Sequence, residues 1–479
     1  MAGHIEASGG GMPEPGAAAR VNMAFVVAIV AVATIGGFMF GYDSGVINGT
    51  QDGLRHAFRL DDAGLGFAVA AILLGCAIGA FSAGRLADVI GRRGVMLIAA
   101  ALFIVSALAA GAADSANLFI IARFIGGLGV GAASVTSPVY ISEVTPASIR
   151  GRLSSVQQIM IIGGLTGAFL VNYILAQTAG ASTAILAGFP AWRWMFWAQV
   201  IPAGVFFATL LLIPESPRYL MVRRREDKAR AVLARLFGAE EADRKVDEIR
   251  ASLATDHQPK LSDLIDATTH RIRPIVWAGI VLAVFQQLVG INIVFYYGAT
   301  LWQAVGFSEN DALKTNILSG GLSIVACLVA IGVIDKIGRK PMLLIGSVGM
   351  AITLGLMAVA FSTGHMEAGK LILPHGMAIM AFIAANSYAA LFNFSWGPVM
   401  WVMLGEMFPN QIRGSGLAVA GFAQWIANFA ISVSFPTLAA TLGLAPTYGF
   451  YAVSALVSFF LVRWLIQETR GRELEQMVG

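Results

Sequence analysis

The sequence predicts an all-α membrane protein whose chain crosses the bilayer twelve times, and three observations support this prediction. Of the 479 residues, 57% are hydrophobic and only 13% are charged. The mean hydropathy of +0.74 is higher than a soluble globular domain needs to form its core. Apolar runs of about 20 residues, the length that crosses a bilayer as a helix, recur in two sets of six.

The apolar runs and the polar segments between them divide the chain into five parts. Residues 1–21 form a tail that we expect to be disordered, because it is rich in Gly, Ala and Pro and lacks the pattern of a signal peptide. Six-helix bundles are expected over residues 22–213 and 274–466, with a short tail at 467–479. Residues 214–273 carry many charges and apolar positions at helical spacing, which predicts amphipathic linker helices. The expected spans are residues 22–47, 63–83, 94–113, 117–140, 153–176, 190–213, 274–298, 313–335, 341–361, 377–404, 414–437 and 444–466.

Lys and Arg are distributed unequally between the two sides of the predicted membrane protein. If the amino terminus is cytoplasmic, 26 of the 32 basic residues lie on the cytoplasmic side and 5 on the outer side. Because cytoplasmic loops carry an excess of Lys and Arg, we expect both termini and the linker in the cytoplasm of a multi-pass inner (plasma) membrane protein. The net charge of +4 then reflects topology rather than binding to nucleic acid.

Three pairs of charged motifs occupy corresponding places in the two predicted bundles. The pairs are GRLADVIGRR (84–93) with DKIGRKP (335–341), Glu143 and Arg150 with Glu406 and Arg413, and PESPR (214–218) with QETRGR (467–472). Corresponding motifs at corresponding places indicate an internal duplication.

These charged side chains can form ion pairs between helix ends and across the two bundles. A network that forms only when one end of the molecule is closed would favour that conformation by its whole energy. The alternative is that the charges only fix the topology. The residues concerned are Arg85, Asp88, Arg92, Arg93, Glu143, Arg150, Arg152, Asp335, Arg339, Glu406 and Arg413.

Two charged residues lie inside predicted spans. Asp43 is the only carboxylate of the first span, and Arg123 is the only basic residue deep inside an apolar run. Charges within a membrane are costly and seek each other as partners, so the pair is a candidate functional site. Burial favours a neutral carboxyl whereas a nearby guanidinium favours the anion, so a change in the Asp43–Arg123 distance would bind or release a proton. A static structural ion pair is the alternative interpretation.

Residues 286–297, QQLVGINIVFYY, place amides and tyrosines within an apolar run. Such groups are costly against lipid, so we expect Gln286, Gln287 and Asn292 to face a partner helix or a water-filled cavity. Gly290 should loosen the helix between them. Elsewhere, the Gly-Pro pair at 397–398 predicts a bend in span 10, and four glycines at 126–131 predict close helix contacts in span 4.

Taken together, these motifs resemble those of the sugar porters of the major facilitator superfamily. The resemblance covers residues 36–472 and rests on the ordered set of GRLADVIGRR, the two Glu-x6-Arg motifs, PESPR, QQLVGIN and GPVMW. Within the family, the chain is most similar to bacterial proton-coupled sugar symporters such as those for D-xylose. The resemblance implies the major facilitator fold, two six-helix bundles around a central cavity with linker helices on the cytoplasmic side. It also implies import of a monosaccharide, a hexose or pentose such as glucose or xylose, by proton symport through alternating access.

The resemblance further implies roles for individual residues. Amides both donate and accept hydrogen bonds, as sugar hydroxyls do, and aromatic rings pack on the apolar face of a sugar. Tyr297 is expected in an extracellular gate, and Asn428 is a less certain part of the sugar site. Asp43 favours symport, because several facilitative relatives carry Asn there. The expected sugar-binding residues are Gln158, Gln286, Gln287, Asn292, Trp401, Gln424 and Trp425, and Glu215 and Arg218 join the charged residues above in a cytoplasmic gate.

Departures from the family pattern leave alternatives open. Two positions that are polar in the xylose symporters are Leu165 and Ser323 here, so the recognised hydroxyl pattern can differ. A facilitative sugar uniporter and a polyol or inositol:proton symporter are the main alternatives. A further interpretation is that the amides in the spans only form hydrogen bonds between helices. We expect no enzyme and no cofactor or metal, and the two cysteines, Cys76 and Cys327, both lie in apolar runs and suggest no disulfide.

Overall fold

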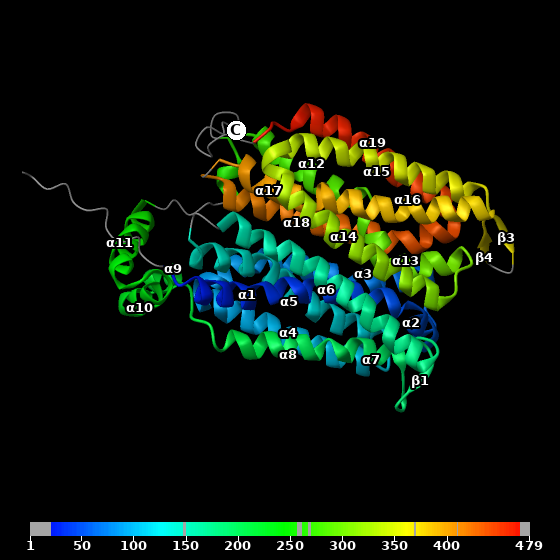
Figure 1. Ribbon diagram of the computed structural model, residues 1–479, viewed down its shortest axis with the longest axis horizontal. Helices are drawn as coiled ribbons and strands as arrows, with labels where there is room; N and C mark the ends of the chain where they lie inside the picture. Colours follow the sequence, from blue (N-terminus) through cyan, green and yellow to red (C-terminus); the bar gives the residue numbers. More distant parts are fainter. Residues whose placement is uncertain are drawn as a thin grey trace, which may run out of the picture.

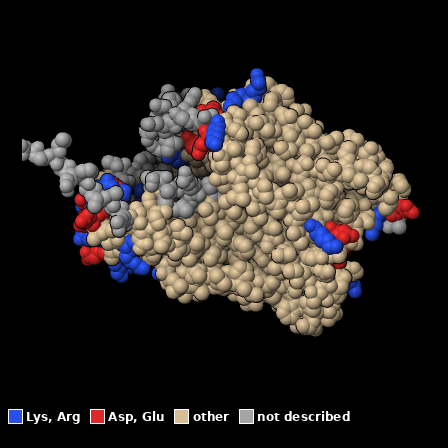
Figure 2. Space-filling model, in the orientation of Figure 1, with Lys and Arg blue, Asp and Glu red and all other residues tan. Residues whose placement is uncertain are grey.

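The computed structural model describes residues 21–146, 150–255, 261–266, 270–367, 370–409 and 411–469, with the backbone alone for residues 150–155, 252 and 254–255. Long helices run side by side through an elongated body, with the short linker helices at one end and two β-hairpins at the other (Figure 1). We call these the linker end and the hairpin end. Figure 2 shows that the face between them is almost free of charged side chains, as a surface that meets lipid requires.

The described residues contain eleven helical stretches that are long and apolar enough to cross a membrane. The one remaining crossing, the sixth along the chain, is made by α7 (Ala191–Ala198) and α8 (Val200–Leu210) together. Gln199, the residue between them, keeps right-handed helical angles (φ −62°, ψ −24°), so the two helices form one path. The expected fold class is therefore confirmed.

Each half of the chain makes six crossings, and the halves pack side by side (Figure 1). The N-terminal half contains α1 (Met23–Val46), the 3-10 turn η1 (Ile47–Gly49), α2 (Gln51–Phe58), α3 (Asp62–Ile90), α4 (Arg92–Ala112), α5 (Ala116–Val144), α6 (Arg150–Ala179), α7 and α8. The C-terminal half contains α12 (Pro274–Leu288), α13 (Ile291–Ala304), α14 (Glu309–Ile337), α15 (Arg339–Ser362), α16 (His375–Phe394), α17 (Trp396–Met407), α18 (Arg413–Thr441) and α19 (Leu444–Leu465).

The linker helices attach to the start of the first membrane helix. They are α9 (Pro217–Val222), α10 (Glu226–Phe237), α11 (Ala239–Thr255) and the 3-10 turn η2 (Leu261–Leu264). The Asn22 amide donates to the Leu236 carbonyl, and the Arg235 guanidinium lies 4.3 Å from the centroid of the Phe25 ring. Between α10 and α11, Arg250 donates to Glu226 (Nη2–Oε1 2.7 Å), and this hydrogen bond lowers the pKa of the Glu226 carboxyl.

The two β-hairpins were not expected from the sequence. β1 (Ile185–Leu186) pairs antiparallel with β2 (Phe189–Pro190), and β3 (His365–Glu367) pairs with β4 (Lys370–Ile372). Ala187 and Gly188, between β1 and β2, have φ angles of +47° and +87°. A two-residue hairpin turn requires such left-handed angles.

Two crossings are broken in the middle, each into two helices. The seventh crossing ends its first helix at Leu288 and restarts at Ile291, because Gly290 has a φ of +81°. The expectation of a continuous, merely loosened helix was wrong: the backbone turns there. The tenth crossing breaks at Ser395, which puts Pro398 in the first turn of α17, where a proline needs no amide donor. The predicted bend is confirmed two residues earlier than expected.

Close contact between α3 and α5 confirms the prediction drawn from the glycines of span 4. A Cβ atom on Gly127 would lie 2.0 Å from the Ile72 carbonyl oxygen, and one on Gly131 would lie 2.1 Å from that of Cys76. No residue with a side chain fits at either position, so the two backbones touch. This contact fixes α5 against the centre of the N-terminal half and with it the side chain of Arg123.

Candidate functional site

Four amide side chains form a connected cluster in the C-terminal half, at the break between α12 and α13. Gln286 lies at its centre: its Oε1 accepts from Gln287 Nε2 and from Gln424 Nε2, both at 2.9 Å. Its Nε2 donates to the Trp396 carbonyl at the other helix break (3.1 Å). Asn292 Nδ2 donates to Gln287 Oε1 at 2.5 Å. We call Gln286, Gln287, Asn292 and Gln424 the amide cluster.

The helix break explains why the amide cluster forms. Gln287 and Asn292 are five residues apart, and the turn at Gly290 brings Asn292 back toward the end of α12. Gln424 Oε1 is buried and has no hydrogen-bond partner among the described residues. A buried acceptor without a donor is costly, so the cluster has hydrogen-bonding capacity left for a ligand.

The other expected sugar-binding residues come from both halves, and no hydrogen bond joins any of them to the amide cluster in the part of the chain that the structure describes. Trp425 is buried on α18, and its ring lies 5.6 Å from that of Phe40 on α1, across the two halves. Trp401 on α17 is 40% exposed, and Gln158 on α6 is half-buried. Ser323 is fully buried and its hydroxyl has no partner among the described residues.

A cavity of about 270 Å³ lies at the hairpin end, between α2 and the start of α14. Its lining residues are Asp52, Arg55, His56, Ser182, Thr183 and Glu309. None of these belongs to the amide cluster. The central cavity expected around Gln158, Gln287 and Trp401 therefore stays a prediction.

Asp43 and Arg123 form a buried ion pair inside the N-terminal half. Asp43 is 0% exposed and Arg123 is 1% exposed. Arg123 Nη1 donates to Asp43 Oδ1, and its Nη2 donates to the Asp43 backbone carbonyl at 3.2 Å. Asp43 Oδ2 and Arg123 Nε have no partner among the described residues. A buried ion pair with free hydrogen-bonding positions is less stabilised than a fully satisfied one.

Two amides that the sequence reasoning missed, Asn48 and Gln51, join the two halves at the hairpin end. Both are 1% exposed. Asn48 Nδ2 donates to the Phe295 carbonyl (2.6 Å), and Gln51 Nε2 donates to the Tyr296 carbonyl (2.5 Å). Asn48 Oδ1 also accepts from the Ala299 backbone amide and from Asn316 Nδ2, and Gln51 Oε1 accepts from Thr300 Oγ1. We call Asn48 and Gln51, with these partners on α13 and α14, the latch.

The sequence did hold a signal for the latch. Asn48 and Gln51 lie three positions apart at the end of an apolar run, so on a helix they share one face. Tyr297, the residue expected in the extracellular gate, contacts α18 of its own half, and its gate role stays a prediction. Its hydroxyl donates to the Ser432 carbonyl on α18 (2.7 Å), and its ring lies 5.1 Å from that of Phe435.

Replacing Gln51 by alanine is expected to open the hairpin end. The change removes one hydrogen bond from the Tyr296 carbonyl and leaves the Thr300 hydroxyl without its partner, which costs about 1–3 kcal/mol in the closed state alone. The ratio of open to closed molecules should rise by about 5- to 150-fold. Spin labels at the exposed positions Ala57 and Asn310, one on each half, report this as a population at longer distance.

Gln303→Ala serves as the matched control for this experiment. Gln303 is also an amide on α13, but it has no hydrogen bond to Asn48 or Gln51. Its substitution should leave the distance distribution unchanged. An unchanged distribution for Gln51→Ala as well would show that the latch does not hold the two halves together.

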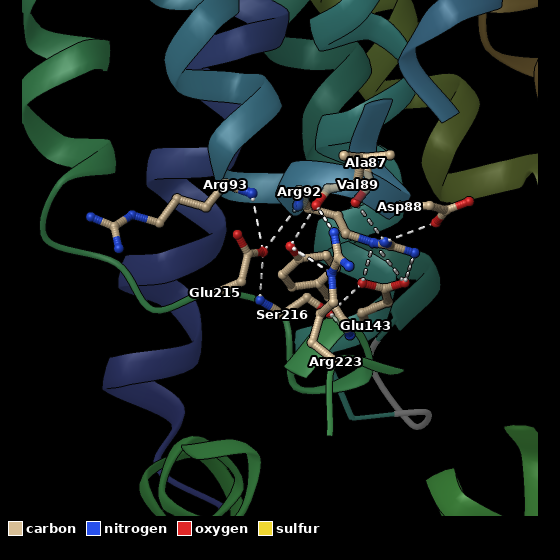
Figure 3. Close-up of polar contacts among 10 residues, drawn as sticks. Ala87, Asp88, Val89, Arg92, Arg93, Glu143, Glu215, Ser216 and Arg223 are labelled. Carbon is tan, nitrogen blue, oxygen red and sulfur yellow. Dashed lines mark hydrogen bonds and ion pairs between the residues drawn. The ribbon is translucent and has the colours of Figure 1, made fainter. Parts of the chain in front are cut away.

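Figure 3 shows an ion-pair network at the linker end of the N-terminal half. Arg92 Nε lies 3.1 Å from Glu143 Oε2, and its Nη1 lies 3.1 Å from Asp88 Oδ1. Glu215 accepts from the backbone amides of Arg92 (3.0 Å) and Arg93 (3.1 Å), the first two residues of α4. Because Gly91 offers no capping side chain, the Glu215 carboxylate satisfies this helix terminus. Ser216 Oγ also donates to Glu143.

The C-terminal half repeats this network residue by residue. Arg339 pairs with Glu406 (Nη2–Oε1 3.0 Å) and with Asp335 (Nη1–Oδ1 2.9 Å). Glu468 accepts from the amides of Arg339 (3.1 Å) and Lys340 (2.9 Å) at the start of α15. Each of these pairs stays within its own half, and such repetition supports the predicted internal duplication.

Other residues of the expected cytoplasmic gate lie near these networks. Arg218 interacts electrostatically with Glu143, and Arg413 Nε donates to the Phe408 carbonyl at 3.2 Å. Arg85 is exposed on α3. The side chains of Arg150 and Arg152 lie outside the described residues. A network across the halves in another conformation therefore stays a prediction.

Two halves of six crossings, a buried acid–base pair in one and an amide cluster in the other, together define a membrane transporter built by internal duplication. The model of the family described as sugar (and other) transporters matches residues 29–478. The chain belongs to this family of transporters.

Curated relatives and solved structures agree with this assignment. A glucose transport protein of Synechocystis sp. is 47% identical over 458 residues, covering 95% of this chain and 97% of the relative. The D-xylose-proton symporter of Escherichia coli is 36% identical over 490 residues, covering 96% of each. A partially occluded inward open structure of the xylose transporter XylE from E. coli matches with a TM-score of 0.80 and 34% identity, over 94% of this chain and 100% of that one. XylE bound to 6-bromo-6-deoxy-D-glucose matches with a TM-score of 0.78 and 35% identity, over 95% and 99%.

Proposed function

We propose that this chain imports a monosaccharide together with a proton, by exposing one central site alternately to the two sides of the membrane. The single observation that carries the proposal is the buried Asp43–Arg123 pair in a chain whose other half holds the amide cluster. One half thus offers a group that can bind a proton, and the other offers groups that can bind a polyhydroxylated solute.

The amide cluster is the proposed centre of the sugar site. Gln424 Oε1 already lacks a donor, and a sugar hydroxyl can supply one while accepting from a neighbouring amide. Trp425 and the half-exposed Trp401 would pack against the apolar face of the ring. Gln158 would complete the site from the N-terminal half. The relatives named for glucose and xylose support a hexose or pentose as the substrate.

Proton coupling is proposed to reside in Asp43. When Asp43 is ionised, Arg123 holds it through the direct ion pair; when it is protonated, that attraction is lost and the two side chains can separate. Tyr296 on α13 interacts with Ser44, the residue that follows Asp43, and with Asn428 on α18, so it lies between the pair and the C-terminal half. A proton on Asp43 can therefore change how α1 holds α13 and α18.

The orientation follows from the distribution of basic residues. The linker end carries most of the Lys and Arg, so we assign it to the cytoplasm and the hairpin end to the outer side. With the latch closed at the hairpin end, the central region is shut off from outside. The similarity to inward open structures of XylE supports an inward-facing state for this conformation.

Proteoliposomes containing the purified protein test the proposal. Adding the transported sugar without any imposed gradient should raise the external pH, because each sugar carries a proton inward. Trials with xylose, glucose, galactose and myo-inositol identify the substrate and separate a sugar carrier from a polyol carrier. Sugar uptake without any proton movement would instead establish the facilitative uniporter.

A further inference from the structure

Besides Asp43, the Arg123 guanidinium has an aromatic ring as a neighbour. Arg123 Cζ lies 5.7 Å from the centroid of the Phe196 ring, which belongs to α7 in the sixth crossing. Phe196 is 0% exposed. A cation within about 6 Å of a ring centroid is attracted by the negative face of the ring, and more strongly where water is excluded.

Phe196 is held in place by other aromatic rings. Phe119, one helical turn before Arg123 on α5, lies 5.4 Å from it at an angle of 71°. Trp192 lies 6.3 Å from it at 85°. Phe58 on α2 closes the group with contacts to Phe119 (6.0 Å) and Trp192 (5.9 Å). This packing lies between the ion pair and the hairpin end, and it fixes the orientation of the Phe196 ring.

Protonation of Asp43 leaves Arg123 as a buried cation that has lost its anion. The Asp43 backbone carbonyl and the Phe196 ring then remain in contact with the guanidinium, and Arg123 Nε has no partner among the described residues. A ring face stabilises a nearby cation. While Asp43 is ionised, its carboxylate holds the guanidinium 5.7 Å from the ring centroid; once Asp43 is protonated, the guanidinium is free to move closer to the ring, and this gain favours the state in which Asp43 carries a proton.

We propose that Phe196 is a positioning residue of the proton site, whose ring holds the Arg123 guanidinium when Asp43 is protonated and so raises the proton affinity of the carrier. This proposal rests on the proposed symport function. The sixth crossing would then take part in proton coupling through a ring contact rather than through a hydrogen bond. The ring acts through Arg123 and does not itself exchange a proton.

Other titratable groups near the pair do not account for a pH dependence in the assay range. Cys76 on α3 interacts electrostatically with both Asp43 and Arg123, and Tyr296 on α13 interacts with Arg123. Thiols and phenols ordinarily titrate above about pH 8. If the pH of half-maximal coupled transport changes between pH 5 and about 7.5, the change is therefore attributed to the Asp43–Arg123 pair.

The test is the pH dependence of sugar uptake in proteoliposomes for Phe196→Leu, Phe196→Tyr and the wild type. Leucine keeps the site apolar but removes the ring face. The midpoint of this variant, the pH at which uptake is half-maximal, should therefore move to lower pH by about 0.5 unit or more, a threefold loss of proton affinity. Tyrosine keeps the ring and should restore the wild-type midpoint. Phe206→Leu is the matched control, because Phe206 is an equally buried ring of the same crossing that packs near Gly36 instead.

Three outcomes separate this inference from the proposed function. An acid shift for Phe196→Leu alone, with rescue by tyrosine, supports it. The wild-type midpoint in Phe196→Leu, or an equal shift in Phe206→Leu, overturns the role of the ring and leaves symport standing. Sugar uptake by the wild type without proton movement overturns symport and this inference together. If Phe196→Leu does not fold, a wild-type midpoint in Phe196→Ile overturns the role of the ring, and an acid-shifted one supports it.

Discussion

Asp43→Asn is expected to abolish uphill sugar uptake and to preserve exchange of sugar across the membrane. The amide can still accept the hydrogen bond from Arg123, but it cannot take up or release a proton. Accumulation driven by a proton gradient should therefore fall to the equilibrium ratio of about one, while counterflow of labelled sugar continues. Both quantities are measured with labelled sugar in proteoliposomes, with and without an imposed pH gradient.

Asp114→Asn is the matched control for this variant. Asp114 is an exposed carboxylate of the same half, in the turn between α4 and α5. Its substitution removes the same charge but should leave accumulation at the wild-type level. Full accumulation by Asp43→Asn would remove Asp43 from the coupling mechanism and favour the static ion pair considered from the sequence.

Gln286→Ala is expected to weaken sugar binding more than any other single change in the amide cluster. Gln286 makes hydrogen bonds with Gln287, Gln424 and the Trp396 carbonyl, and alanine leaves all three without that partner. Losing a hydrogen bond to the sugar, together with the contacts that orient Gln287 and Gln424, should cost about 1–3 kcal/mol of binding free energy, so the dissociation constant should rise by about 10- to 100-fold. Titration calorimetry with the transported sugar measures this directly.

Gln177→Ala controls for the loss of an amide as such, since Gln177 is exposed near the hairpin end of α6. The sugar affinity of Gln177→Ala should match that of the wild type. The thermal stability of both variants, measured without sugar, separates a binding defect from a folding defect. Wild-type affinity in a folded Gln286→Ala protein would show that the amides serve contacts between helices and that the sugar binds elsewhere.

The number of crossings and the duplication could be predicted because they depend on local patterns. Length and hydropathy determine which segments can span a bilayer, and the paired motifs lie in the loops where the two networks form. The pairing of Asp43 with Arg123 could also be predicted, because two isolated charges of opposite sign inside the membrane are most stable next to each other.

Features that depend on backbone angles or on contacts between the halves could not be read in this way. Gly290 takes a left-handed conformation, and only that turn explains why Asn292 reaches Gln287. The latch requires the register of α2 against α13, which no pattern within either segment encodes. Phe196 looks like any core aromatic until its ring is found over Arg123.

The carboxylates of Glu215 and Glu468 each close a six-helix half upon itself. Each carboxylate follows the last helix of its half and caps the helix of the third crossing, α4 or α15. The end of each half is thus fastened to an earlier helix at the membrane surface. A polypeptide of only six helices would already contain every part of this clasp. Each half thus closes this contact with its own residues, so movement of one half against the other need not break either clasp.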